Sequence, residues 1–220
     1  MVVPDRVPDR PPVRHYLHVY ADGNPVILDR FLREHFRAVD QSRVIYDEMV
    51  FGIVGEPANR AIVREYLPQG RVHEWGAGFE QRTLQVLHRD VMSGDIDGYV
   101  MYAHSKGVAH PSSVSEGWRQ CMTRHVVRNA AHAITMLGMG ADTVGVHWLT
   151  KADDPARVEI PFYGGNYWWS KVEHLRRLAP VGTTVRHEAE GWLGSVPPEN
   201  PASFVSGWPG SECPNHQRKG

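Results

Sequence analysis

The segment YAHSKG, residues 102–107, places a histidine, a hydroxyl, a lysine and a glycine directly after an apolar run. Lys106 is a point cation suited to a phosphate, and the Ser105 hydroxyl and the Gly107 backbone N–H can add hydrogen-bond donors. Ser, Lys and Gly are also common in ordinary turns. The position of this segment at the end of a predicted strand favours a ligand site, because ligands bind at the carboxyl ends of strands in open α/β sheets.

The segment FYGGNYWWSK, residues 162–171, surrounds two glycines with aromatic side chains. Gly165 permits a close approach of the backbone to a ligand, and Asn166 can both donate and accept hydrogen bonds. Aromatic faces beside an amide are typical of sugar recognition. The alternative is that the tryptophans are core residues. Because neighbours in a strand face opposite ways, we expect at most one of Trp168 and Trp169 to be core.

The segment RHEAEGW, residues 186–192, carries Glu188 and Glu190 beside aromatic bulk. If the segment is extended, both carboxylates lie on one face, whereas in a helix they diverge by about 200°. A carboxylate near aromatic side chains can serve as a general base toward a hydroxyl. The alternative is an ordinary pair of surface glutamates.

The tripeptide Asp95-Ile96-Asp97 has the form of the Asp-x-Asp motif with which sugar-nucleotide enzymes hold a divalent cation. Such a motif should follow a strand, whereas this one precedes the apolar run that begins at Tyr99. We therefore predict a turn at the opposite edge of the sheet. The sequence contains no P-loop, G-x-G-x-x-G, H-E-x-x-H or C-x-x-C motif, so it lacks the usual marks of nucleoside triphosphatases, dinucleotide oxidoreductases and zinc proteases.

The chain has 220 residues, of which 41% are hydrophobic, and a formal net charge of −1 at pH 7. This charge gives no global attraction to nucleic acid or to an anionic membrane. The 13 histidines are scattered and define no metal site. Cys121 and Cys213 argue against a disulfide scaffold and suit a reducing compartment. No apolar stretch approaches the roughly 18 to 20 residues that span a bilayer, so we expect a cytoplasmic protein without a transmembrane segment.

Four strand-then-helix units follow one another along the chain. Each strand is a continuous apolar run, which favours a mostly parallel central sheet with helices on both faces and an α/β fold class. The predicted strands are 15–20, 49–55, 70–75 and 99–104, and the predicted helices are 25–36, 56–67, 78–92 and 112–137. Strands at 143–149 and 157–170 and a short helix at 171–178 complete a single domain over 14–195, between a Pro-rich lead at 1–13 and an irregular tail at 196–220.

Taken in order, these blocks resemble a family of bacterial GT-A-like glycosyltransferases. Its members read approximately Y-x-H-T-K-G, then a D-W-R helix, G-N-F-W-W-A and R-Y-E-A-E-x-W-x-G. The matching blocks here are YAHSKG, Trp118-Arg119, GGNYWWSK and EAEGWLG, with HVY, FGIVG and an E-x-x-TL block at Glu80 upstream. The likeness covers about Arg14 to Gly194 and implies a single GT-A-like, Rossmann-like domain.

The resemblance implies transfer of a sugar from a nucleotide diphosphate-sugar to a hydroxyl acceptor, such as a glycan, a small molecule or a modified base in DNA. It implies a donor site at Tyr20, Val54, Gly55, His104, Ser105, Lys106 and Gly107. It implies a sugar and acceptor site at Gly165, Asn166, Trp168 and Trp169. It also implies a catalytic base in the acidic pair, for which we prefer Glu190 over Glu188. Lys106 and Ser105 would neutralise the departing diphosphate without a tightly held metal, and a divalent cation, Mn²⁺ or Mg²⁺, bound through His104 is the alternative.

Two other functions are compatible with these residues. One is a non-catalytic module on the same fold that binds nucleotide-sugars or carbohydrates, because a fold does not determine an activity. The other is sugar transfer onto modified bases in DNA, which would need a local basic patch in a chain of nearly neutral charge. The candidate residues for that patch are Arg124, Arg128, Arg176 and Arg177.

Overall fold

The computed structural model describes residues 10–66, 70–156, 158–182 and 188–205. Its strands are β1 (Val13–Tyr20), β2 (Glu48–Val54), β3 (Arg71–Trp75), β4 (Tyr99–His104), β5 (Thr143–Gly145), β6 (Trp148–Leu149), β7 (Phe162–Tyr163), β8 (Trp168–Lys171) and β9 (Pro201–Ser203). Seven of them form one sheet in the order β3-β2-β1-β4-β8-β5-β9, and β6 and β7 form a separate ribbon.

The central sheet is mixed and mostly parallel. β1, β2, β3 and β4 run parallel, in the order 3-2-1-4 that is typical of a Rossmann-like half. β8 lies between β4 and β5 and runs antiparallel to both. The amino end of β8 therefore lies at the same edge of the sheet as the carboxyl end of β4.

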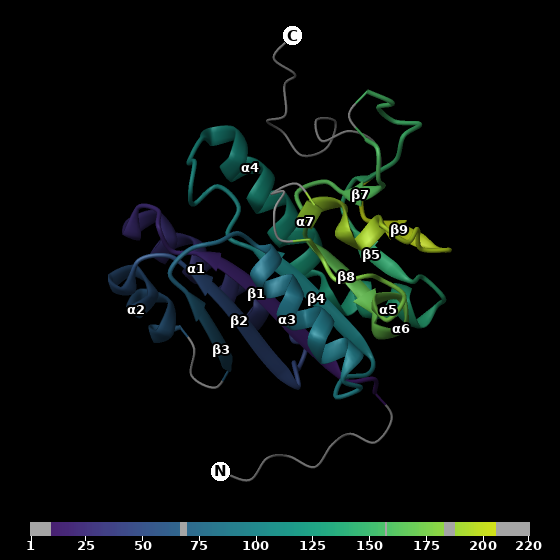
Figure 1. Cartoon of the computed structure of the whole chain (residues 1–220), viewed down its shortest axis with the longest axis horizontal. Coiled ribbons are helices and arrows are strands. Elements are labelled where there is room, and N and C mark those ends of the chain that lie inside the picture. Colours follow the sequence, from purple (N-terminus) through teal and green to yellow (C-terminus); the bar gives the residue numbers. More distant parts are fainter. Residues whose placement is uncertain (1–9, 67–69, 157, 183–187, 206–220) are drawn as a thin grey trace.

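Helices cover both faces of this sheet (Figure 1). They are α1 (Pro25–Ser42), α2 (Pro57–Glu65), α3 (Gln81–Met92), α4 (Ser113–Met122), the π-helical turn η1 (Thr123–Arg128), α5 (Ala130–Gly138), α6 (Val172–Leu175), α7 (Glu188–Gly191) and the 3₁₀ turn η2 (Trp192–Gly194). None of the helices in the described residues is long and apolar enough to cross a membrane.

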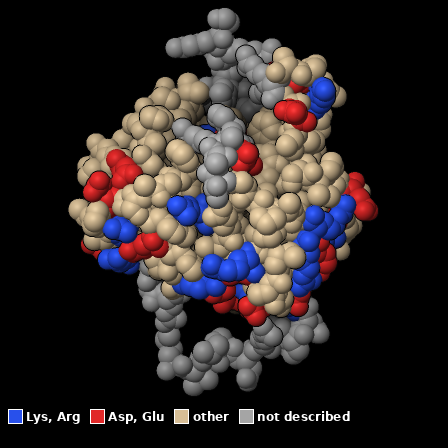
Figure 2. Space-filling model, viewed as in Figure 1, with Lys and Arg blue, Asp and Glu red and all other residues tan. Residues whose placement is uncertain are grey.

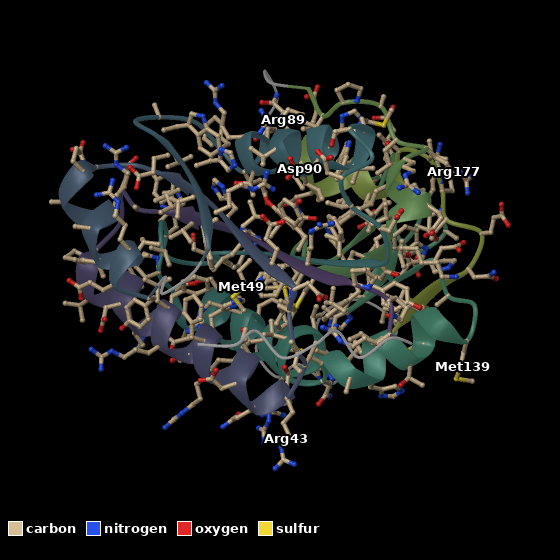
Figure 3. The ribbon with its side chains drawn as sticks, turned by 90° about the horizontal axis from the view of Figure 1, so that it is seen from below. Arg43, Met49, Arg89, Asp90, Met139 and Arg177 are labelled. Carbon is tan, nitrogen blue, oxygen red and sulfur yellow. The ribbon has the colours of Figure 1, made fainter. Side chains whose placement is uncertain are left out.

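The two faces of the sheet bury two separate hydrophobic cores. One core packs α1, α2, η1 and α5 against the sheet, and the other packs α3, α6 and α7 against the opposite face. Figure 3 shows this layering, with Arg89 and Asp90 of α3 on one side and Arg43 and Met139, at the ends of α1 and α5, on the other. The predicted α/β fold class, with helices on both faces of a mostly parallel sheet, is confirmed.

Local chemistry explains how α1 begins and which face it buries. The Asn24 side chain accepts a hydrogen bond from the Val26 N–H at 2.9 Å, and Pro25 occupies the first helical position. Both features favour a helix start. The buried stripe includes Leu28, Phe31 and Leu32. Its spacing of three and four residues directs one face onto the sheet.

The long helix predicted over 112–137 is interrupted in the structure. α4 passes into the π-helical turn η1 before α5 begins at Ala130. α4 begins with a capping box formed by two serines, Ser112 and Ser115. The Ser112 hydroxyl accepts from the Ser115 N–H, and the Ser115 hydroxyl accepts from the Ser112 N–H, both at 3.0 Å. This reciprocal pair satisfies two N–H groups at the start of the helix.

The irregular tail predicted over 196–220 is wrong for Pro201–Ser203, which form β9. This strand pairs in parallel with β5 at the edge of the sheet. A proline at the first residue of an edge strand costs no ladder hydrogen bond, so its presence does not prevent pairing. The single strand predicted over 143–149 is divided between β5 and β6. Residues 1–9 of the predicted lead and 206–220 of the predicted tail lie outside the described residues.

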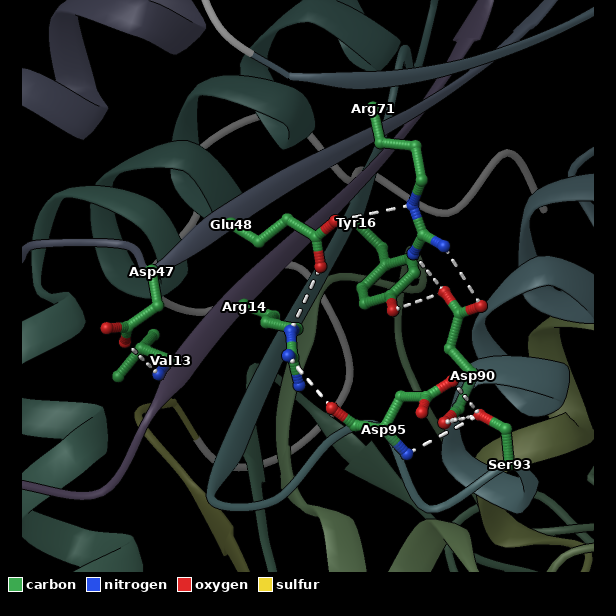
Figure 4. A network of polar contacts seen from close by, with 9 residues as sticks. All are labelled: Val13, Arg14, Tyr16, Asp47, Glu48, Arg71, Asp90, Ser93 and Asp95. Atoms are coloured by element: carbon green, nitrogen blue, oxygen red, sulfur yellow. Dashed lines mark hydrogen bonds and ion pairs between the residues drawn. The ribbon is translucent and has the colours of Figure 1, made fainter.

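A polar network occupies the amino edge of the sheet (Figure 4). Glu48 accepts from the Arg14 Nε at 3.0 Å and lies 3.3 Å from the Arg71 Nε, and Asp90 accepts from the Tyr16 hydroxyl at 2.7 Å. Asp90 also pairs with Arg71. These contacts join β1, β2, β3 and α3 away from the carboxyl edge.

The Asp-x-Asp tripeptide lies beside this network, as predicted. Asp95 accepts from the Ser93 hydroxyl at 2.7 Å, and Asp97 pairs with Arg176 at 2.6 Å. Both carboxylates precede β4 and face the amino edge, where they hold a turn. They are therefore far along the strand from the residues that follow its carboxyl end.

Candidate functional site

A cavity of about 360 Å³ opens at the carboxyl edge of β1 and β4. Its walls include Tyr20 from the end of β1, Lys106 from the loop after β4, and Glu190 from α7. This is the edge at which open α/β sheets place ligands. The structure therefore brings the predicted cation and the predicted base to one cavity, although more than 80 residues of sequence separate them.

Backbone hydrogen bonds hold the loop after β4 in place. The Ser105 N–H donates to the His18 carbonyl at 2.9 Å, and the Ser105 hydroxyl accepts from the Tyr20 N–H at 2.7 Å. Gly107 has a φ of +81°, in the left-handed region that glycine adopts without strain. The loop thus follows the end of β1 and directs the next side chain, Lys106, into the cavity.

Lys106 is held between two helices. Its Nζ lies 4.0 Å from the Glu190 Oε1 on α7 and 5.1 Å from the centre of the Trp118 ring on α4. An ammonium over a tryptophan face is attracted by the negative face of the ring. Figure 1 shows α4 and α7 at the same end of the sheet.

The two glutamates of α7 diverge because the segment is helical. Glu190 lines the cavity with Lys106, while Glu188 is exposed and lines a neighbouring cavity of about 490 Å³. Glu190 lines both cavities. The walls of the neighbouring cavity are largely apolar and include Phe162 and Trp192. The geometry thus favours Glu190 over Glu188 as the group that faces the cation.

Both tryptophans of β8 are core residues, which corrects the expectation that at most one of them is. Trp168 is 1% exposed and stacks on Tyr102 in one core, and Trp169 is fully buried in the other, where its Nε1 donates to the Val126 carbonyl at 2.8 Å. β8 is an interior strand covered on both faces, so neighbours that face opposite ways are both buried. Neither side chain is among the described residues that line the cavity.

Gly165 and Asn166 form the turn that leads into β8. Gly165 has a φ of +81°, in the left-handed region that favours glycine, and a Cβ there would meet the end of the Met122 side chain of α4. Asn166 is 1% exposed, and its amide oxygen and nitrogen are hydrogen-bonded to three protein groups. The predicted sugar contact by Asn166 is therefore not supported by its surroundings.

Val54 and Gly55 lie beside the cavity without lining it among the described residues. Val54 pairs with Tyr20 in the sheet and is buried. Gly55 has a φ of +135°, and a Cβ there would lie 2.6 Å from the Ala21 carbonyl carbon. Of the predicted donor-binding residues, Tyr20, His104, Ser105, Lys106 and Gly107 line the cavity.

His18 and Glu80 are among the residues that line the cavity and were not predicted from the sequence to belong to the site. Burial is the main cause that lowers the pKa of His18 to about 4, so its ring is neutral at neutral pH. Its Nδ1 lies 2.8 Å from the Thr83 Oγ1. Their positions in the sequence could have indicated both residues. His18 lies near the carboxyl end of β1, and Glu80 is the first residue of the E-x-x-TL block that follows β3.

The described residues contain no group of three or more His, Cys, Asp or Glu side chains placed to hold a metal ion. The His104 Nε2 lies 2.9 Å from the Gly165 carbonyl, and its Nδ1 lies 3.8 Å from the Glu80 Oε2. The Nε2 is therefore directed at a protein group, whereas the Nδ1 faces the Glu80 carboxylate, which also lines the cavity. A divalent cation bound through His104 stays a prediction.

The four arginines considered for a DNA-binding patch do not gather on one surface. Arg124 and Arg128 belong to η1, which packs in the first core, whereas Arg176 and Arg177 follow α6 on the opposite face of the sheet. Arg176 pairs with Asp97, and Arg177 lies 3.7 Å from Glu199. Figure 2 likewise shows basic and acidic side chains interspersed over one face of the molecule.

Comparisons with known proteins give a family and several structures with similar chain paths. One structure is a 4-diphosphocytidyl-2C-methyl-D-erythritol synthase, with 15% identity, 90% of each chain covered and a TM-score of 0.47. Another is glucosyl-3-phosphoglycerate synthase from Mycobacterium tuberculosis with uridine-diphosphate, with 12% identity over 96% of this chain and 73% of that chain, and a TM-score of 0.47. S. aureus TarS 1–349 has 9% identity over 89% and 61%, and a TM-score of 0.48.

No curated protein matches this chain. One family profile, in contrast, matches residues 16–187, which include every strand from β2 to β8, most of β1, and the loop that carries Lys106. The chain therefore belongs to DUF8361, a domain of unknown function.

Proposed function

We propose that this protein is a glycosyltransferase that moves a sugar from a nucleotide diphosphate-sugar to a hydroxyl acceptor. The observation that carries the proposal is the shared cavity, in which Lys106 and Glu190 face each other with 4.0 Å between Nζ and Oε1. The sequence resemblance to GT-A-like glycosyltransferases supports the same reaction class. A glycosyl phosphate bond is already activated, so positioning and charge stabilisation are the main tasks of the protein.

In this proposal the acceptor hydroxyl attacks the anomeric carbon of the donor. The new C–O bond forms as the bond from the anomeric carbon to the phosphate oxygen breaks, and the electron pair of that bond leaves with the nucleoside diphosphate. Glu190 takes the proton of the acceptor hydroxyl. Lys106 and the Gly107 backbone N–H stabilise the negative charge on the diphosphate. No step uses a metal ion.

The test is an incubation with UDP-, GDP- and TDP-sugars, with release of free nucleoside diphosphate as the measurement. We expect release from one of these donors, and Lys106→Ala should lower the rate by about 100-fold because the leaving group loses its cation. Lys171→Ala is the matched control. Lys171 lies 3.8 Å from Asp142, at the carboxyl end of the antiparallel strand β8 and thus at the opposite edge of the sheet, and its loss should leave the rate unchanged.

Two outcomes would contradict the proposal. Binding of a nucleotide-sugar, seen as a thermal shift, without any release of diphosphate in the presence of alcohols and sugars would identify a binding module. An unchanged rate in Lys106→Ala would remove this lysine from the diphosphate site.

A further inference from the structure

Glu80 and Asn166 form a hydrogen-bonded bracket beside the cavity. The Glu80 Oε2 accepts from the Tyr102 hydroxyl at 3.1 Å and from the Asn166 Nδ2 at 3.0 Å. These contacts join the start of α3, the strand β4 and the turn that precedes β8. A carboxylate that accepts several hydrogen bonds orders the groups that donate to it.

The orientation of the Asn166 amide is determined by its partners. The Trp168 Nε1, which can only donate, lies 2.8 Å from the Asn166 Oδ1, and the Nδ2 donates to Glu80 and to the Ala189 carbonyl at 3.2 Å. With the oxygen and nitrogen exchanged, donors would face donors at Trp168. Asn166 has a φ of +56°, a left-handed conformation that asparagine tolerates better than most residues.

The Ala189 carbonyl belongs to the residue before Glu190. Within the described residues α7 spans four residues, and a helical segment of this length has little stability of its own. Its position therefore depends on contacts such as the one from Asn166. The same turn also holds the wall of the cavity that carries Lys106. The Nε2 of His104, which is two residues before Lys106, lies 2.9 Å from the Gly165 carbonyl.

We propose that Glu80 and Asn166 are positioning residues that set the separation between Glu190 and Lys106 across the cavity. They act through the backbone of α7 at Ala189 and through β4 at Tyr102 and His104. The inference rests on the proposed function for its effect on turnover, but its structural part can be tested without turnover.

The first test is Asn166→Gly. Glycine adopts a φ of +56° without strain, so the turn is retained while the amide is removed. We expect kcat to fall by about 10- to 100-fold, in the range that misplacement of a reacting group produces. The KM of the donor and the affinity for UDP, GDP or TDP should change by less than about threefold, because Lys106 and its loop are intact. Rates are expressed per nucleotide-binding site, so that misfolded protein does not contribute.

Thr143→Val is the matched control. The Thr143 Oγ1 makes a buried hydrogen bond to the Tyr163 hydroxyl at 3.0 Å, outside the bracket. Valine has nearly the same shape, so this variant loses a buried hydrogen bond and some stability in the same half of the molecule. We expect its kcat per binding site to equal that of the unsubstituted protein.

The second test pairs Asn166→Asp with Glu80→Gln. The single change Asn166→Asp places a carboxylate against Glu80 and should lower kcat at least as much as Asn166→Gly. Adding Glu80→Gln supplies an amide that donates to the new carboxylate, so we expect partial recovery of kcat. No recovery in a folded double variant would contradict the direct link between the two side chains.

Hydrogen–deuterium exchange tests the bracket independently of activity. In Asn166→Gly the amides of residues 188–194 should exchange faster, while those of β1 should not change. If no donor is turned over, the proposed function fails and this measurement still decides on the bracket. Unchanged exchange over 188–194, or an unchanged kcat in Asn166→Gly, would overturn the inference.

Discussion

At the scale of single residues, the cavity contains two kinds of carboxylate. Glu80 has one oxygen committed to Tyr102 and Asn166, whereas Glu190 has Lys106 as its nearest charged partner at 4.0 Å. A carboxylate that acts as a base must give up its contact with a protein group in order to receive a proton. The contact between Glu190 and Lys106 is longer and more exposed than the hydrogen bonds of Glu80, so Glu190 can do this more easily. This difference in environment is the reason why we propose Glu190 for proton transfer and a positioning task for Glu80.

Glu190→Gln should lower kcat by at least about 100-fold, because the glutamine amide cannot accept the proton. The affinity for the nucleoside diphosphate should change by less than about threefold. Glu188→Gln, which alters the exposed neighbour on the same short helix, should have little effect on either quantity. Steady-state rates and calorimetry with UDP, GDP and TDP measure both. A larger loss in Glu188→Gln would reverse the assignment.

At the scale of elements, close contact between β2 and α3 positions the residues of the cavity floor. A Cβ at Gly52 would lie 1.8 Å from the Thr83 Oγ1, and the same oxygen lies 2.8 Å from the His18 Nδ1. Thr83 is fully buried, so it cannot move toward solvent. The absence of a side chain at Gly52 therefore allows α3 to approach the sheet and to orient His18.

Gly52→Ala should lower the free energy of unfolding by about 1–3 kcal/mol, the usual cost of overpacking a core. Chemical denaturation followed by circular dichroism measures this change. Gly76→Ala is the control, because a Cβ at Gly76 has no atom within 4 Å and its φ lies outside the left-handed region. Equal stabilities of the two variants would show that α3 shifts freely against β2.

The sequence predicted some elements better than others for physical reasons. The four strand-then-helix units of the first half are local patterns of apolar residues. Three of their helices also have start signals, an asparagine cap followed by proline at α1, a first-turn proline at α2 and a serine cap at α4. The placement of β8 between β4 and β5 depends on pairing between distant segments. The same holds for β9, whose short sequence has no distinguishing pattern. Trp168 and Trp169 were misjudged because burial on both faces follows from that placement.

The candidate site was predictable to a similar extent. Position at the end of a strand was sufficient to single out Ser105 and Lys106, because it follows from local sequence alone. The role of Asn166 was not, since an asparagine offered to a ligand and one bonded to Glu80 and Ala189 have the same sequence signature. Which glutamate of α7 faces Lys106 depended on whether residues 188–190 are helical.

At the scale of the whole molecule, the histidines couple stability to pH. His15 and His35 are fully buried with their Nε2 atoms 3.3 Å apart. Burial is the main cause that lowers the pKa of His35 to about 3, and it also lowers that of His15 well below its usual value. With His18, these groups are neutral in the folded protein and titrate near pH 6.5 once the chain unfolds.

Below pH 6.5 the unfolded chain binds more protons than the folded protein, so the free energy of unfolding should fall as the pH falls. Between pH 7.5 and pH 5 we expect a loss of about 2 kcal/mol for each such histidine. Urea denaturation at the two pH values measures the loss. His35→Leu should have a smaller pH dependence than the unsubstituted protein. Equal stability at both pH values would contradict buried neutral histidines.

The cysteines lead to a different conclusion from the one expected. Cys121 is disulfide-bonded, so the two cysteines do not support a reducing compartment. Cys213 lies outside the described residues. The compartment therefore stays a prediction that rests on the sequence alone.

The antiparallel strand β8 also has a consequence for synthesis on the ribosome. β5 leaves the ribosome before β8, yet it has no place beside β4 until β8 arrives, since β8 separates them in the sheet. In a nascent chain that ends before Trp168, the side of β4 that pairs with β8 would be unpaired. Each of the two hydrophobic cores would also lack its tryptophan from β8, Trp169 in one and Trp168 in the other. Translation must pass Lys171 before the two hydrophobic layers can close together.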